Sequence, residues 1–214
     1  MADHKNQHYV PRCHFRPFSL GGEGKAIHLF NICKALPIPN APVKGQCSKN
    51  YFHGKGGLED DLANIEGIYS SVVHPLIDGR SSLSHEDFRF FAAFAFLQYH
   101  RTASAIQRKR YGDLEMQAAA FYNAPDQRPN LDLSDTALIH ESIELFQDNA
   151  YFIGDLKCCI VRNITSRDFV TSDDPAVLTN RFYIQRLDRT RLRNSVVRCN
   201  SCARAVSSLP LHRL

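Results

Sequence analysis

The chain has 214 residues, 43% of them hydrophobic, which suits one globular domain with enough length to bury a core. It has no run of about 18 apolar residues and no N-terminal signal-peptide pattern, so we expect neither insertion into a membrane nor secretion. The net charge of +4 comes from residues 185–214, where seven arginines and one acid give +6 and leave −2 for the rest, so a nucleic-acid partner has weak support.

The N-terminal part is predicted to be rich in loops, with short strands. A strand over 26–31 follows a glycine-rich turn at 21–24. Three prolines then predict an extended connection with few backbone donors; they are Pro37, Pro39 and Pro42. A second short strand is predicted over 50–53.

Helices are predicted in the middle of the chain. Apolar residues recur at spacings of three and four over 58–77, which is typical of a helix with one buried face. Ser84 and Asp87 form a capping-box pattern that begins a second helix, which continues through Arg101 as the central core helix. Further helices are predicted over 112–122 and 135–148. The basic run 107–110 is expected to end the central helix, where cations favour the helix dipole.

The pattern changes beyond the fourth helix. Strands are predicted over 157–162 and 168–171, before a turn at 172–175. The predicted class is therefore α+β: an N-terminal element of loops and short strands, a central helical bundle, and the start of a C-terminal antiparallel sheet. Residues 1–184 are expected to form a single globular domain with an incomplete sheet, followed by an Arg-rich tail over 185–214.

Four short motifs follow one another in the order found in a known family. They are His8 with Pro11 and Phe18, Glu66 in the first predicted helix, Gln98 with Arg101 in the second, and Thr171-Ser172-Asp173 with Pro175 in the turn. Each motif alone is weak, but their order from residue 8 to about 182 resembles the bacterial family catalogued as domain of unknown function 4238. The resemblance implies no particular reaction.

The resemblance also makes the C-terminal part unusual. Members of the family usually continue well beyond the Ser-Asp-x-Pro turn, with strands that complete the sheet. Here the composition changes after Gln185 to arginine, serine, cysteine and leucine, without strand alternation or a helical stripe. We therefore expect a truncated or frameshifted end, in which the Cys-x-x-Cys at 199–202 is accidental.

The seven cysteines are odd in number and irregularly spaced. A secreted disulfide framework more often has an even count and a signal peptide. The sequence therefore favours free thiols and a cytoplasmic location.

Two charged residues that are expected to be buried define the candidate site. Arg101 ends a nearly apolar helix and Glu66 lies beside an apolar stripe, and an unpaired buried charge is very costly. A structural ion pair between them and a polar cleft that uses both would each meet this need, and both alternatives stay open. The candidate catalytic residues are His8, Glu66, Arg101 and Asp173, and the candidate binding residues are Gln98 and Ser172.

Functions of different classes fit these residues. In the first, a divalent metal assists a nuclease-like hydrolysis, with Asp173 and Glu66 as ligands or base and His8 as base or ligand. Arg101 would stabilise developing negative charge. In the second, the chain is a non-catalytic module that binds a small molecule or a protein, and this copy of it could be degenerate. The enzyme hypothesis requires His8 and the carboxylates to lie within a few ångströms of one another; the binding hypothesis does not.

Overall fold

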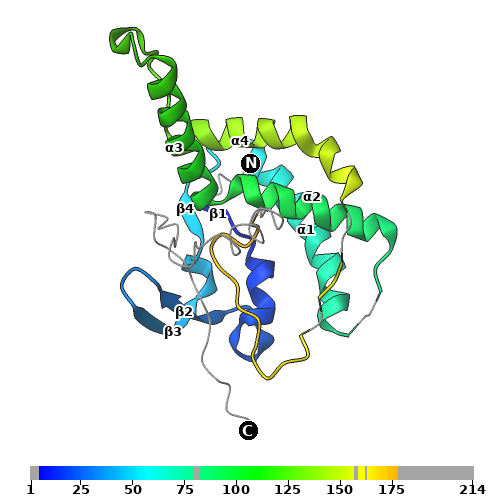
Figure 1. Ribbon diagram of the computed structural model, residues 1–214. Helices are drawn as coiled ribbons and strands as arrows, with labels where there is room; N and C mark the ends of the chain where they lie inside the picture. The colour runs from blue at the N-terminus through cyan, green and yellow to red at the C-terminus, as the bar shows by residue number, and fades with distance from the viewer. Residues whose placement is uncertain (1–4, 80–81, 157–158, 162, 178–214) are drawn as a thin grey trace, which may run out of the picture.

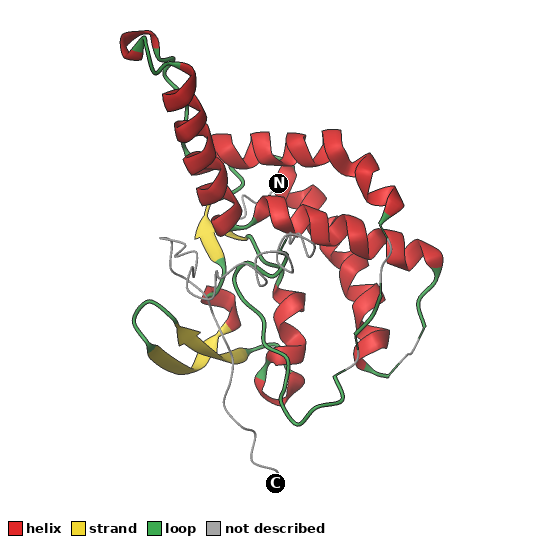
Figure 2. Ribbon diagram, in the orientation of Figure 1, coloured by secondary structure: helices red, strands yellow, loops and turns green. Residues whose placement is uncertain are grey.

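Helices form the larger part of the molecule, and antiparallel strand pairs lie beside them (Figures 1 and 2). The computed structural model describes residues 5–79, 82–156, 159–161 and 163–177. Its α-helices are α1 (Leu58–Ile77), α2 (His85–Arg101), α3 (Ala103–Ala120) and α4 (Asp135–Asn149). Its strands are β1 (Asn6–His8), β2 (Ala26–Asn31), β3 (Leu36–Pro42) and β4 (Ser48–Asn50). Short 3-10 turns connect them, the longest being η1 (Arg12–Phe18) and η5 (Ala150–Asp155). The α+β class is confirmed.

The first two predicted helices are confirmed with their signals. α1 has the predicted bounds, and α2 begins directly after the predicted cap. The Ser84 hydroxyl accepts the Asp87 amide hydrogen at 3.0 Å, and the Asp87 carboxylate accepts the Ser84 amide hydrogen at 3.0 Å. This reciprocal capping box satisfies two N–H groups that the helix itself leaves without partners. The fourth helix is also confirmed, one residue longer than predicted.

The third helix was predicted too short, and the end of the central helix was placed too late. α2 ends at Arg101 because Thr102 adopts an extended conformation, and the Thr102 hydroxyl caps α3 by accepting the amide hydrogen of Ala105 at 3.1 Å. The basic run 107–110 therefore lies inside α3. Figure 1 shows α3 leaving the other helices as a projecting arm.

Two strand predictions need correction. Residues 36–42 are a strand, not a connection, because β2 and β3 pair as an antiparallel hairpin from Ala26↔Pro42 to Asn31↔Leu36. Proline is tolerated there because a two-stranded ribbon has only edge strands, where a missing N–H group needs no partner. The second short strand lies at 48–50, where it pairs with β1, because the backbone turns at Tyr51 (φ 51°) and Gly54 (φ 81°).

The predicted start of a C-terminal sheet is not found among the described residues. Residues 159–161 and 168–171 form no strand there, and the antiparallel pairs are all N-terminal. Val161, Phe169 and Val170 are exposed, so the apolar residues that were expected to form strands bury no apolar face. Parts of these predictions lie outside the described residues: residues 157, 158 and 162 of the predicted strands, the expected boundary at 184, and the Arg-rich tail.

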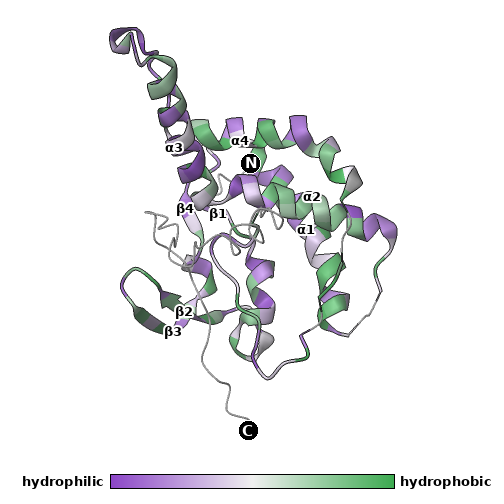
Figure 3. Ribbon diagram, viewed as in Figure 1, coloured by the Kyte–Doolittle hydropathy of each residue, from purple (hydrophilic) through white to green (hydrophobic). Residues whose placement is uncertain are grey.

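The core consists of two clusters joined by one side chain. The larger packs α1, α2, α3 and α4 around Leu97 and Ile139, and Figure 3 shows the matching hydrophobic middle of α2. The smaller packs η1 against the hairpin around Phe15 and Ile27. Tyr9 contacts both clusters, so the N-terminal segment connects hairpin and helices. Within the described residues, no helix is long and apolar enough to cross a membrane.

The first prediction concerns the capping box of α2. Ser84→Ala should lower the free energy of unfolding by about 1 kcal/mol, because the amide of Asp87 loses its acceptor. Ser84→Asp, which keeps a capping oxygen, is the control and should remain near wild type in urea unfolding. Equal losses in both variants would contradict a capping role.

Candidate functional site

The centre of the site is the guanidinium of Arg101, which has 0% exposure. Its Nη2 donates to Oε1 of Glu66 at 2.5 Å and to the backbone carbonyl of His8 at 2.8 Å. The ion pair considered from the sequence is thus present, between the end of α2 and the middle of α1. The carbonyl of His8 adds β1 to this contact.

The imidazole of His8 takes no part in this contact. Its Nε2 hydrogen-bonds with the carbonyl of Lys44 at 3.2 Å, and burial lowers the pKa of His8. The structure therefore brings three of the candidate residues together, Glu66 and Arg101 by their side chains but His8 by its backbone.

Buried polar atoms without partners surround Arg101. A guanidinium has five N–H donors, and neither Nε nor Nη1 of Arg101 has a hydrogen-bond partner within the described residues. Gln98 lies one turn earlier on α2, is 3% exposed, and has no partner there for either atom of its amide. Buried polar groups are nearly always satisfied, and the binding role expected for Gln98 stays a prediction.

His53 is a functional candidate that the sequence analysis missed. Its Nδ1 donates to Oε2 of Glu59 at 2.6 Å, so Nε2 is an acceptor, and this buried atom has no partner among the described residues. Burial lowers the pKa of His53, while the Glu59 carboxylate and Glu66 oppose that effect and Arg101 adds to it. The only sequence signal for His53 was its place in an apolar segment next to the turn at Gly54.

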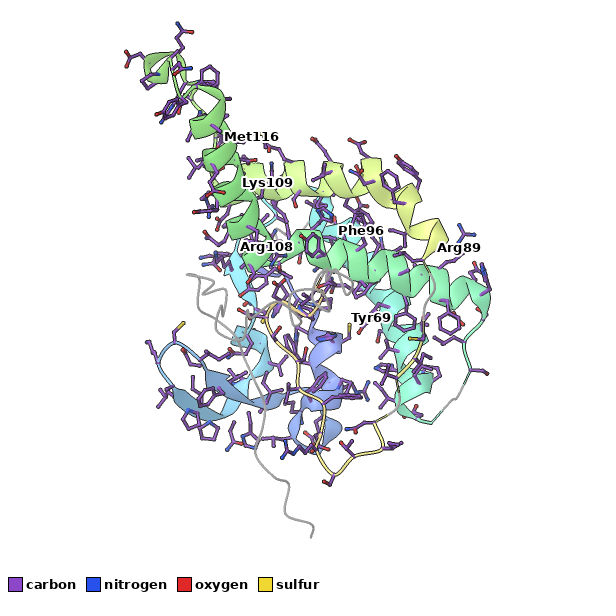
Figure 4. All side chains as sticks on the ribbon, in the orientation of Figure 1. Tyr69, Arg89, Phe96, Arg108, Lys109 and Met116 are labelled. Carbon is purple, nitrogen blue, oxygen red and sulfur yellow. The ribbon has the colours of Figure 1, made fainter. Side chains whose placement is uncertain are left out.

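The Ser-Asp-Asp-Pro turn docks on the start of α3. Asp174 accepts hydrogen bonds from the Thr102 hydroxyl at 2.8 Å and from Nη1 of Arg108 at 2.5 Å. Figure 4 labels Arg108 at the base of α3. The Ser172 hydroxyl stays within the turn and donates to the carbonyl of Asp174 at 2.9 Å. Asp174, which the sequence analysis treated as turn chemistry, thus anchors the turn, and its neighbour Asp173 is buried.

Asp173 forms part of a pocket at the hairpin. The pocket has a volume of about 150 Å³ and is lined by Tyr9, Phe15, Ile27, Leu29, Phe30, Asn31, Ile38, Gln46, Cys47 and Asp173. Asp173 is 7% exposed. Burial, reinforced by the Asp173 carboxylate, raises the pKa of Cys47 to about 12 and also raises the pKa of Tyr9. Both groups are therefore protonated at neutral pH, so Asp173 shares the pocket lining with two neutral donors.

His14 holds the second end of the turn. It hydrogen-bonds through Nδ1 with the Tyr69 hydroxyl at 3.1 Å and through Nε2 with the Thr171 hydroxyl at 2.7 Å. Burial lowers the pKa of His14 to about 4, so the imidazole is neutral. The opening His-Tyr-Val-Pro-Arg-Cys-His-Phe segment therefore anchors the turn at 171–174 to α1.

The described residues contain no group of three or more His, Cys, Asp or Glu side chains arranged to hold a metal ion. The cysteines among the described residues are of two kinds. Cys13, Cys47 and Cys159 are free thiols, as expected, whereas Cys33 is in a disulfide, contrary to expectation.

Comparison with known proteins gives one match. A family model described as "Protein of unknown function (DUF4238)" matches residues 6–199, which confirms the resemblance. The match extends beyond the motifs, which end near residue 182, and includes the first half of the Arg-rich tail. No curated protein and no solved structure matches the chain.

The second prediction concerns the ion pair between Glu66 and Arg101. Glu66→Gln should lower the free energy of unfolding by about 3 kcal/mol, because it leaves the buried charge of Arg101 uncompensated. Glu144→Gln, at an exposed position on α4, is the control and should change stability by less than about 0.5 kcal/mol. The double variant Glu66→Leu/Arg101→Met removes both charges and should recover part of the loss. Losses that simply add would show that the pair is not coupled.

His14 makes the third prediction, a pH dependence. Its pKa of about 4 in the folded chain lies below the ordinary value of 6.5, so between these pH values the unfolded chain binds a proton that the folded chain does not. Stability from His14 is complete above about pH 6.5 and falls as the pH drops towards 4, by as much as about 3 kcal/mol. Urea unfolding of His14→Gln should show a shallower loss of stability over this range than wild type. His85→Gln, at an exposed histidine, should keep the wild-type slope.

Proposed function

Because the chain belongs to the DUF4238 family, whose description assigns no function, we propose its function from the site: it is a non-catalytic module that binds a small ligand in the pocket at the hairpin. The observation that carries this proposal is the pocket itself, whose lining is mostly apolar with a few polar side chains. Ligand sites typically have this composition.

The size of the pocket limits the ligand. A volume of about 150 Å³ is below the range of roughly 300–1,000 Å³ typical of small-molecule sites. It is close to that of an apolar cavity that holds a single benzene ring. The ligand is therefore a single ring or a branched aliphatic group, with one polar group that meets Tyr9, Cys47 or Asp173.

Metal-assisted hydrolysis has less support. It requires the carboxylates and the His8 imidazole to converge, but Glu66 is engaged by Arg101 and the His8 ring faces the carbonyl of Lys44. Arg101 is better explained as a structural residue. Its charge is already paired with Glu66 and is fully buried, so it is poorly placed to contact a substrate. The catalytic roles first assigned to His8, Glu66, Arg101 and Asp173 thus stay predictions, as do the binding roles of Gln98 and Ser172.

The fourth prediction tests the pocket with a filling substitution. Phenol, benzylamine and benzoate serve as single-ring probes in ligand-observed NMR with the full chain. At least one should bind, and Ile38→Trp, which fills the pocket, should abolish its signal. Ile32→Trp lies on the same hairpin outside the pocket lining and should bind as wild type.

Thermal melts with Mn²⁺, Mg²⁺ or Zn²⁺ separate the two functions. The binding module is expected to melt at the same temperature with and without metal. A rise in melting temperature that is lost in Asp173→Ala or Glu66→Ala would instead favour the metal-dependent hydrolase.

A further inference from the structure

A groove is lined by residues of the α3 arm and its neighbours. In Figure 1 this arm projects away from the β2–β3 hairpin. The groove has a volume of about 350 Å³, and its walls come from α3, from residues 129–133 and from α4. Met116 on α3 is 68% exposed, and Figure 4 labels it far out along the arm. The floor is formed by Leu133 and Leu138.

The groove is held open by side chains of α3 that bind the returning segment. Nε2 of Gln117 donates to the carbonyl of Pro129 at 2.5 Å. Nε and Nη2 of Arg110 both donate to the carbonyl of Leu133 at 3.1 Å, and Nη2 also donates to Asp135 at 2.6 Å. The walls are therefore fixed before anything binds, which lowers the entropy lost on binding.

The rim of the groove is acidic. Asp113, Asp132 and Glu141 line it, and Lys109, labelled in Figure 4, pairs with Asp113 at 3.0 Å and with Glu141 at 2.9 Å. Residues 111–133 carry four acids and one arginine, a net charge of −3 in a chain of net +4. An acidic rim repels nucleic acid and anionic membrane surfaces and attracts a basic partner.

Further apolar side chains are exposed elsewhere on the arm, outside the groove lining. Tyr111, Leu114 and Tyr122 are exposed on the same arm. An exposed apolar patch with a polar rim typically marks a protein–protein contact, in which one anchor side chain fills a pocket. The groove combines exposed apolar side chains with the three acids that line it.

We propose that this groove docks a basic, amphipathic segment of a partner protein, whose apolar anchor contacts Met116 and Leu133 while its lysines or arginines face Asp132 and the neighbouring acids. The partner surface is separate from the small-ligand pocket and does not depend on it. Helix-in-groove recognition follows the same logic, with apolar anchors at helical spacing.

The test uses two fluorescein-labelled peptides and the full chain. One peptide has leucine at helical spacing with lysine at the other positions, and the matched peptide has glutamate in place of lysine. Fluorescence polarisation should show binding of the lysine peptide that weakens with added salt, and at least about tenfold weaker binding of the glutamate peptide.

Variants assign the binding to the groove. Met116→Ala should weaken binding of the lysine peptide roughly tenfold because it removes the apolar contact. Leu145→Ala, at an exposed leucine of α4 outside the groove, is the matched control and should bind as wild type. Asp132→Asn keeps a side-chain oxygen for the amide of Ser134 and should weaken binding about threefold, with a shallower salt dependence.

Three outcomes would overturn the proposal. The two peptides could bind alike, Met116→Ala and Leu145→Ala could behave alike, or sedimentation could show a dimer of the chain that Met116→Ala dissociates. The last result would identify a second copy as the occupant. Ile38→Trp should bind the lysine peptide as wild type, so failure of the hairpin pocket and failure of the groove are distinguishable.

Discussion

The burial of one permanent cation constrains the whole arrangement. An arginine cannot lose its proton in a protein, so Arg101 must be buried as an ion, and the effective penalty is several kcal/mol even after relaxation. Only a packing that brings Glu66 and the carbonyl of His8 to the same guanidinium offsets that penalty. The angle between α1 and α2 and the path of β1 are therefore linked, since a shift of either removes a hydrogen bond from a group with no water to replace it.

The next residue extends the same junction. Thr102 ends α2, caps α3 and donates to Asp174, so one hydroxyl serves two segments about 70 residues apart in sequence. Arg108, one helical turn and a half further along α3, holds the other oxygen of Asp174. The turn that carries Asp173 to the hairpin pocket is thus positioned by the start of the arm that carries the groove. The hairpin pocket and the groove, which we propose as binding surfaces, therefore share a common anchor.

The sequence predicts this fold where the determinants are local. The periodicity of α1 and the capping box of α2 involve neighbouring residues only, and both helices were predicted correctly. The cap at Thr102 lacks an acidic partner three residues later, so the break between α2 and α3 had no comparable signal. The prolines of β3 argued against a strand, and only the two-stranded pairing, a tertiary property, permits them.

The same distinction between general and fold-dependent determinants applies to the residues of the candidate site. The Glu66–Arg101 pair could be expected because desolvation of a charge is a general cost, whatever the fold. The hydrogen bond between His8 and Arg101 could not be expected, because His8 accepts it with its backbone carbonyl, a group that every residue has. Asp174 was missed because its partners at the base of α3 are distant in sequence. His53 was missed because its contact with Glu59, six residues later, depends on how the turn at Gly54 leads into α1.

The stability of the arm does not account for its exposed apolar side chains. Ala105 and Ile106 at the base of α3 are buried, so the first turns are held by the core. Further out, the helix is maintained by good helix formers such as Leu114, Met116 and the alanines that follow, and by the returning segment bound through Gln117. Isolated helices of this length are marginal in water, and a charged surface would support the arm equally well. The exposed side chains of Met116 and Tyr122 bury little apolar surface within the chain, and the partner proposed for the groove would add hydrophobic stabilisation by covering Met116.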